Sequence, residues 1–126
     1  MQIDILYNLA NTEVMTENHN EAIQKYELVL KYLETRQASP DLTDETEVDN
    51  MKEQQDRLLF NLANSYSQLD DLENSLLYFE KSIAFNENNV ESLLGLAKVY
   101  QKMQKYKLAI DLYDKANKLL PESDKE

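Results

Sequence analysis

The tetrapeptide Asn-Leu-Ala-Asn occurs at residues Asn8–Asn11 and again at Asn61–Asn64, and a divergent copy at residues 95–98 reads Gly-Leu-Ala-Lys. Each copy lies within the same wider pattern of small and large apolar residues. Ala63 and Ala97 lie 34 residues apart in that pattern. A fixed internal period of this length predicts an array of similar structural units stacked on one another.

The apolar residues of each unit recur at the spacing of an amphipathic helix, as at Leu59, Leu62, Tyr66 and Leu69. A short polar turn at residues 70–71 separates two such segments. One helical hairpin cannot bury its own apolar face, whereas stacked hairpins can. The pattern predicts two regular hairpins, formed by residues 58–69 with 72–85 and by residues 90–103 with 106–120.

Small residues recur where the two helices of a hairpin approach each other, at Ala63, Ser75, Ala97 and Ala109. Large residues such as Phe79 fill the space beside those contacts. In length and pattern the chain resembles the tetratricopeptide repeat family over most of residues 2–121. The resemblance implies an all-α, right-handed superhelical stack of three hairpins in a single domain. We expect repeat 1 at about 3–37, a helical insert with an acidic loop at about 38–55, repeat 2 at about 56–89, repeat 3 at about 90–121 and a polar tail at 122–126.

The first and second units are separated by 53 residues, which is 19 more than the regular period. Val48, Met51, Gln55 and Leu58 extend the apolar stripe of the following helix backward, so the extra residues are expected to be mostly helical. Thr43 or Asp44, with Glu47 three or four residues later, makes a plausible helix start. The sequence therefore predicts an elongated helix pair joined by a loop that contains Pro40.

The start of this second long helix is acidic, and no basic residue lies among its carboxylates, which are Asp41, Asp44, Glu45, Glu47 and Asp49. A solvated helix start that suits the helix dipole explains such a run, and we favour that interpretation. A docking site for a basic partner is the alternative.

The composition excludes several functional classes. The net charge of −11 and the sequence pI near 4.5 disfavour binding to nucleic acid or to anionic membrane surfaces. The chain has no cysteine, no apolar run that would span a bilayer and no secretory signal pattern. We therefore expect no metal, no cofactor and a cytoplasmic or nuclear location.

Catalysis is not expected either. His19 is the single histidine of the chain, and we assign it to an exposed turn between Glu17 and Glu21. No second nitrogen ligand or thiol completes a zinc site, and no glycine-rich phosphate loop occurs.

The family resemblance implies that the first helix of each hairpin lines a concave groove. Asparagine both donates and accepts hydrogen bonds, so repeated asparagines could hold the main chain of an extended peptide. This pattern resembles the asparagine ladder in the repeat domain of O-linked N-acetylglucosamine transferase. Asparagine as an ordinary polar lining of the groove is the alternative. The candidate peptide-binding residues are Tyr7, Asn8, Asn11, Arg57, Phe60, Asn61, Asn64, Leu94, Lys98, Gln101 and Lys102.

The layout also resembles the repeat domains of large immunophilins and related co-chaperones, which hold a C-terminal carboxylate with three basic residues and two asparagines. Asn11 and Asn61 match the two asparagines. The three basic positions are occupied by Tyr7, Glu91 and Gly95, so this clamp lacks its cations. We therefore treat a co-chaperone-like adaptor with a non-standard clamp as an alternative function.

The last predicted helix is followed by no polar capping helix, although repeat stacks usually need one. Its apolar residues would then lie partly uncovered, which suggests either a segment of a longer protein, which we favour, or a surface covered by another chain. We predict a protein–protein interaction module that binds an extended peptide, with a structural scaffold segment as the alternative. A second interface, including self-association through the third hairpin, would use Leu108, Leu112, Leu119, Asp44, Glu45 and Glu47.

Overall fold

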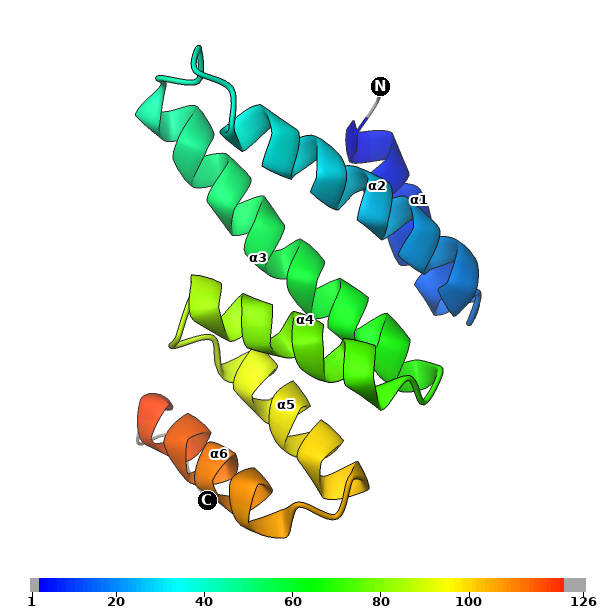
Figure 1. The fold of residues 1–126 in the computed structure, drawn as a ribbon, viewed down its shortest axis with the longest axis vertical. Coiled ribbons are helices and arrows are strands. Elements are labelled where there is room, and N and C mark those ends of the chain that lie inside the picture. The colour runs from blue at the N-terminus through cyan, green and yellow to red at the C-terminus, as the bar shows by residue number, and fades with distance from the viewer. Residues whose placement is uncertain (1–2, 122–126) are drawn as a thin grey trace.

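The computed structural model describes residues 3–121, which form six α-helices and no strand (Figure 1). Consecutive helices run antiparallel as three hairpins stacked along the molecule. This arrangement confirms the predicted all-α repeat stack. The helices are α1 (Ile3–Met15), α2 (His19–Gln37), α3 (Glu45–Gln68), α4 (Leu72–Phe85), α5 (Val90–Lys102) and α6 (Tyr106–Leu119).

The turn within each hairpin is closed in the same way. Glu17, Asp70 and Gln104 adopt left-handed backbone conformations, with φ of 65°, 59° and 63°. In each turn the next residue donates its backbone N–H to the carbonyl five residues earlier, at 2.8, 3.0 and 2.8 Å. This closure satisfies carbonyls that the end of a helix leaves without partners. The repeat is therefore preserved in the backbone of the turns even though none of the three residues is glycine.

The predicted elongated helix pair consists of α2, with 19 residues, and α3, with 24 residues. Both helices continue past the start of α1, and the loop that joins them lies at one end of the molecule (Figure 1). Asp44 is the N-cap of α3, and its side chain accepts hydrogen bonds from the backbone N–H groups of Thr46 and Glu47. Of the two predicted helix starts, Asp44 is thus the one that the chain uses.

The acidic run does have a compensating base, which corrects the expectation from sequence. Arg36, at the end of α2, donates from Nε and Nη2 to Glu47 Oε1 at 3.3 and 3.1 Å, and from Nη1 to Asp41 Oδ1 at 3.1 Å. A hydrogen bond from Ser39 and the Arg36 guanidinium hold the pKa of Asp41 below its usual value. The sequence did not indicate this ion pair because Arg36 lies eleven residues before Glu47, and the two side chains meet only where the loop folds back.

Two apolar clusters form the core. The first joins α1 and α2 to the middle of α3, from Met51 to Leu62, with Tyr26 and Leu33 almost completely buried. The second joins the end of α3 to α4 and α5 around Phe79, which is 1% exposed. The predicted small residues Ala63 and Ala97 are fully buried, so the close helix contacts lie where the repeat pattern places them.

A buried polar network links the second hairpin to the third. Ser82 Oγ on α4 donates to Asp56 Oδ1 on α3 at 2.9 Å and lies 2.6 Å from Ser92 Oγ on α5. Asn89, the N-cap of α5, donates to both oxygens of Asp56. Ser82 therefore does more than occupy a small packing position, because it also fixes the position of α5 relative to α3.

Among residues 3–121, no helix is both long and apolar enough to cross a membrane. The predicted polar tail, residues 122–126, lies outside the described residues.

Candidate protein-binding faces

All the predicted peptide-binding residues lie on α1, α3 and α5, which are the first helices of the three hairpins. We call the surface formed by these residues the groove face. Six of them are exposed, namely Asn8, Arg57, Asn64, Lys98, Gln101 and Lys102. The other five are partly buried, namely Tyr7, Asn11, Phe60, Asn61 and Leu94.

Two asparagines of the groove face are hydrogen-bonded to each other across the hairpins. Asn61 Nδ2 on α3 donates to Tyr7 OH on α1 at 2.8 Å and to Asn11 Oδ1 at 3.5 Å. The Tyr26 hydroxyl on α2 also donates to Asn11 Oδ1. The network ties α1, α2 and α3 together, so Asn11 and Asn61 are structural residues whatever else they do.

The network leaves hydrogen-bonding capacity on Asn61. Each asparagine offers two N–H donors and a carbonyl oxygen with two lone pairs. Both donors of Asn61 are used, whereas its Oδ1 has no partner among the described residues. The Asn11 side chain is more fully used, because its Oδ1 accepts two bonds and a side-chain hydrogen bond also links it to Tyr7. The pair therefore leaves Asn61 Oδ1 as an acceptor, the complement of a peptide N–H group.

Tyr7 is held between the groove face and the core. Its ring packs against Tyr26 at a centroid distance of 5.9 Å, and its hydroxyl accepts the bond from Asn61. Burial raises the pKa of Tyr7, while the nearby charge of Arg57 acts in the opposite direction. Tyr7 therefore stays neutral at physiological pH.

In the third hairpin the groove face includes a glycine, Gly95, packed against an aromatic ring. A Cβ atom on Gly95 would lie 2.3 and 2.4 Å from two ring atoms of Phe79, so only glycine leaves room for that ring. Phe79 also packs edge-on against Phe60, at a centroid distance of 5.9 Å. Phe60 and Leu94 thus flank a stretch of α5 backbone backed by a buried aromatic ring.

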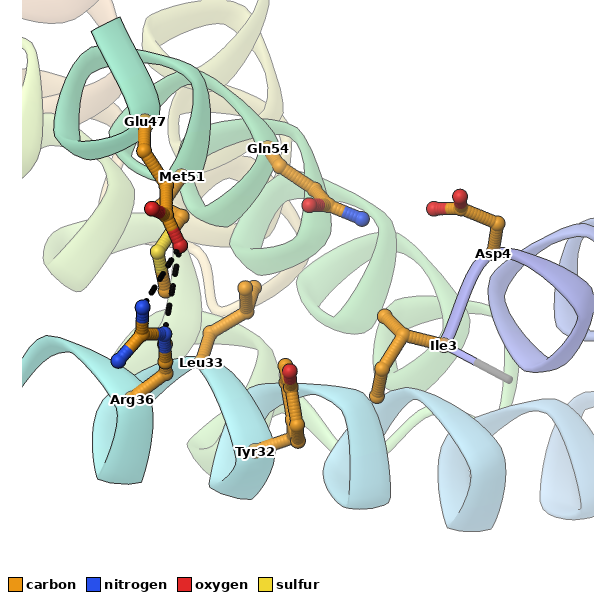
Figure 2. Close-up of a pocket in the computed structure, with 8 residues that line it drawn as sticks. All are labelled: Ile3, Asp4, Tyr32, Leu33, Arg36, Glu47, Met51 and Gln54. Atoms are coloured by element: carbon orange, nitrogen blue, oxygen red, sulfur yellow. Dashed lines mark hydrogen bonds and ion pairs between the residues drawn. The ribbon is translucent and has the colours of Figure 1, made fainter. Parts of the chain in front are cut away.

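A cavity of about 300 Å³ lies where α1 begins and the elongated α2–α3 pair continues (Figure 2). Leu33 and Met51 are buried at its base. Figure 2 shows Asp4 facing Gln54 across the opening, with the Arg36–Glu47 ion pair at the far side. The remaining lining residues are Ile3 and Tyr32. The sequence did not predict this cavity, because the cavity forms where α2 and α3 extend beyond the first residues of α1.

A second cavity, of about 290 Å³, lies between the end of α1, the start of α2 and the end of α3. It is lined by the predicted residue Asn64 and by His19, whose Nδ1 is shielded from solvent and has no described partner. The expectation that His19 is an exposed turn residue is wrong, since it is the first residue of α2 and is half-buried. Ser65 Oγ, also shielded and without a described partner, borders the same space.

At the other end of the groove face, Lys98, Gln101 and Lys102 line a more open hollow of about 470 Å³ together with Tyr106 of α6. Lys102 also donates to Ser67 Oγ on α3 at 3.3 Å. The groove face is therefore basic near Lys98, whereas Asp4 borders the separate cavity at the start of α1.

The predicted second interface consists of two separate surfaces. On α6, Leu108 and Leu119 are 46% and 38% exposed, whereas Leu112 is partly buried against the second core cluster. At the start of α3, Glu45 is exposed, while Asp44 caps the helix and Glu47 pairs with Arg36. Two of these three carboxylates thus already have partners within the chain.

A family model described as tetratricopeptide repeat matches residues 56–89 and 90–122, which together are more than half of the chain. The paired helices, the buried small residues and the recurring turns agree with this match. The chain belongs to the tetratricopeptide repeat family. Repeats of this family are generally protein–protein interaction modules.

Solved structures share the fold at low sequence identity. The C-terminal tetratricopeptide-repeat domain of a Plasmodium falciparum protein described as FK506-binding superposes with a TM-score of 0.81, at 22% identity over 93% of this chain and 76% of that one. The first repeat domain of Spaghetti (RPAP3), bound to the HSP90 peptide SRMEEVD, superposes with a TM-score of 0.72. The sequence identity is 16%, and the match covers 96% of this chain and 81% of that one. The crystal structure of MamA superposes with a TM-score of 0.72, at 18% sequence identity over 95% of this chain and 59% of that one. A comparison with curated proteins found no match.

Proposed function

We propose that this protein binds an extended peptide segment of a partner protein along the groove face. The observation that carries the proposal is the row of groove-face asparagines, in which Asn61 Oδ1 is left as an acceptor and Asn8 and Asn64 are exposed with no described side-chain hydrogen bond. The bond to Tyr7 holds the Asn61 amide in place before the ligand arrives. Such preorganisation reduces the ordering cost of binding. We expect micromolar affinity, as is usual for a short peptide in a small interface.

The charges of the groove face favour a polar or mildly acidic peptide over a basic one. Arg57, Lys98 and Lys102 lie on the groove face and outnumber Asp4 and Glu91, which lie on the same first helices of the hairpins, although the whole chain carries a net charge of −11. Charge complementarity mainly affects association rate and specificity, so we expect this preference to weaken with added salt.

The C-terminal tail of a chaperone is a poor candidate for this peptide. The similar domain of Spaghetti binds the acidic peptide SRMEEVD. Here Glu91 and Gly95 occupy two of the positions that carry basic residues in the clamp, and the Phe79 ring fills the space beside Gly95. A carboxylate placed there would meet a like charge and no guanidinium. The co-chaperone alternative therefore requires a ligand held in some other way.

The decisive experiment removes groove amides that have no structural task. Asn8 and Asn64 are exposed and their side chains make no described hydrogen bond, unlike those of Asn11 and Asn61. The double variant Asn8→Ala, Asn64→Ala should remain as stable as the wild type and lose peptide partners in a pull-down. The matched control is Asn20→Ala, Asn117→Ala, which removes two exposed amides from α2 and α6.

Partners lost only from the groove variant, followed by titration of the recovered segment as a synthetic peptide, would support the proposal. Equal capture by all three proteins would refute it. That outcome would favour the scaffold alternative, which is based on the exposed apolar residues of α6. A scaffold segment should instead lose its partners with Leu108→Asp or Leu119→Asp, because both side chains are substantially exposed.

A further inference from the structure

Gln55 is a polar residue in the apolar stripe of α3. The residue is 7% exposed, and its Oε1 is shielded from solvent and has no hydrogen-bond partner among residues 3–121. A buried amide without a partner destabilises the folded state, and an apolar residue of similar size would remove that cost. The burial of this particular amide therefore points to a role other than packing.

Gln55 lines a cavity of about 260 Å³ between α2, α3 and α4. The walls are otherwise mainly apolar, with Leu30, Leu59, Ala84 and Phe85 around the space. Phe85 is 39% exposed, so an apolar surface is already open to solvent at the mouth. A buried amide within an apolar collar is the usual composition of a small binding pocket.

This cavity lies on the side of α3 away from the groove face. On a helical wheel of α3, Gln55 and Leu59 point roughly opposite to Arg57, Asn61 and Asn64. α2 and α4 both pack on α3, and the cavity lies between them. A ligand in this cavity and a peptide on the groove face would therefore bind without sharing a residue.

The mouth of the cavity carries charges of opposite sign. Glu34 stands on α2 and Lys81 on α4, and the Lys81 ammonium also lies 5.2 Å from the ring centroid of Tyr78. Opposed charges at the rim select neither an anion nor a cation, so the occupant is a neutral group. The apolar walls require a large apolar body, and the unpartnered Gln55 oxygen requires a hydrogen-bond donor.

We propose that this cavity is a second binding site, which accepts a tryptophan side chain of a partner protein and pairs its indole N–H with Gln55 Oε1. Indole combines a large apolar surface with a single donor and no acceptor, which matches the cavity in both respects. The terminal torsion of glutamine is broad and roughly two-fold, so the amide can turn its oxygen toward the ligand. The chain contains no tryptophan, so a second copy of it cannot supply this occupant.

The probe for this site is N-acetyl-L-tryptophanamide. Because the protein has no tryptophan, fluorescence excited where tyrosine does not absorb reports only the probe. We expect millimolar affinity for a ligand of this size. In ¹H–¹⁵N spectra the probe should shift the side-chain amide of Gln55 and the backbone amides of Ala84 and Phe85. The amide of Asn64, on the groove face, should not move.

Two comparisons test the hydrogen bond. The 1-methyl derivative of the probe cannot donate from its indole nitrogen but keeps its amide groups, and we expect it to bind about tenfold more weakly. In the variant Gln55→Leu the two probes should bind with equal affinity. The matched control is Gln68→Leu, which makes the same change on the opposite side of α3 at an exposed position and should preserve the tenfold preference.

A variant at the rim keeps the test independent of the core. Ala84 is exposed and borders the cavity, so Ala84→Phe should fill the space and abolish binding without affecting the fold. Equal affinity of the two probes for the wild type would overturn the proposal. Shifts confined to the groove face, unchanged binding to Ala84→Phe, or equally tight binding of N-acetyl-L-phenylalaninamide would overturn it as well.

Discussion

Replacing Gly95 with alanine should destabilise the protein, which is the reverse of the usual effect in a helix. Glycine within a helix is normally less stable than alanine by about 1 kcal/mol, so Gly→Ala commonly stabilises. Here the added Cβ atom would lie 2.3 and 2.4 Å from ring atoms of Phe79. Real Cβ atoms do not approach carbon so closely, so either the ring or α5 has to move.

The size of the effect follows from the burial of that ring. Phe79 is 1% exposed and packs edge-on against Phe60, so it cannot swing into solvent without opening the second core cluster. Overpacking of a core typically costs about 1–3 kcal/mol, and this contact belongs at the upper end of the range. After subtracting the gain in helix propensity, we expect Gly95→Ala to lower the free energy of unfolding by about 2 kcal/mol.

The assay is thermal and urea unfolding followed by far-ultraviolet circular dichroism. For a chain of this size the expected change corresponds to a fall in Tm of about 8 °C. The control is the double variant Gly95→Ala, Phe79→Leu, compared with Phe79→Leu alone. With the ring removed, the alanine should be neutral or stabilising. A Gly95→Ala protein as stable as the wild type would refute the close packing of Phe79 on α5, and with it the argument that this position cannot hold a basic clamp residue.

Three further predictions concern other parts of the molecule. Asn61→Ala should lower the free energy of unfolding by about 1–2 kcal/mol because it breaks the bonds between α3 and α1. The control Asn64→Ala should change it by less than about 0.5 kcal/mol. Equal urea midpoints for the two variants would contradict a stabilising role of the Asn61 bonds. Arg36→Ala should speed hydrogen exchange in the loop between α2 and α3 while costing less than about 1 kcal/mol overall, and unchanged exchange there would show that the ion pairs do not hold the loop. Burial raises the pKa of Tyr26 and Tyr66, so their stabilising contribution is complete below the unfolded-state pKa of about 10 and is lost as the pH rises further. Melting temperatures should therefore fall above about pH 10, and absorbance titrations that show every tyrosine ionising near pH 10 in the folded protein would contradict this.

The repeat pattern was enough to predict the helices. Apolar spacing placed α4 at the observed residues and gave the ends of α5 and α6 to within one residue. The same spacing predicted that α3 extends backward, because Met51 and Leu58 continue its stripe and both are buried. These predictions succeeded because helix periodicity and burial are local properties of the sequence.

Contacts between distant residues could not be predicted in the same way. The bond from Asn61 to Tyr7 joins residues 54 positions apart, and nothing in either neighbourhood indicates it. The role of Ser82 was underestimated for a similar reason. A small residue at a helix contact is explained by packing alone until Asp56 and Ser92 are brought beside it.

Gln55 is a polar residue in an apolar stripe, and the sequence alone does not indicate why it is there. A glutamine in an apolar stripe was recognised as part of the stripe, but only the structure shows that its amide borders a cavity between α2 and α4. In the same way, sequence placed Tyr7 on the groove face, whereas the structure divides its surface between that face and the core.

The measurement that tests the central claim most directly is photo-crosslinking from the groove face. A photo-reactive amino acid is placed at position 64 on the groove face or at position 20 on α2, and both proteins are irradiated in cell extract. The account predicts that position 64 captures a defined partner segment, that the segment as a free peptide binds with micromolar affinity, and that Asn8→Ala, Asn64→Ala weakens this binding. Equal crosslinking from both positions, or a captured segment whose affinity the double variant leaves unchanged, would contradict the claim that this face holds a peptide.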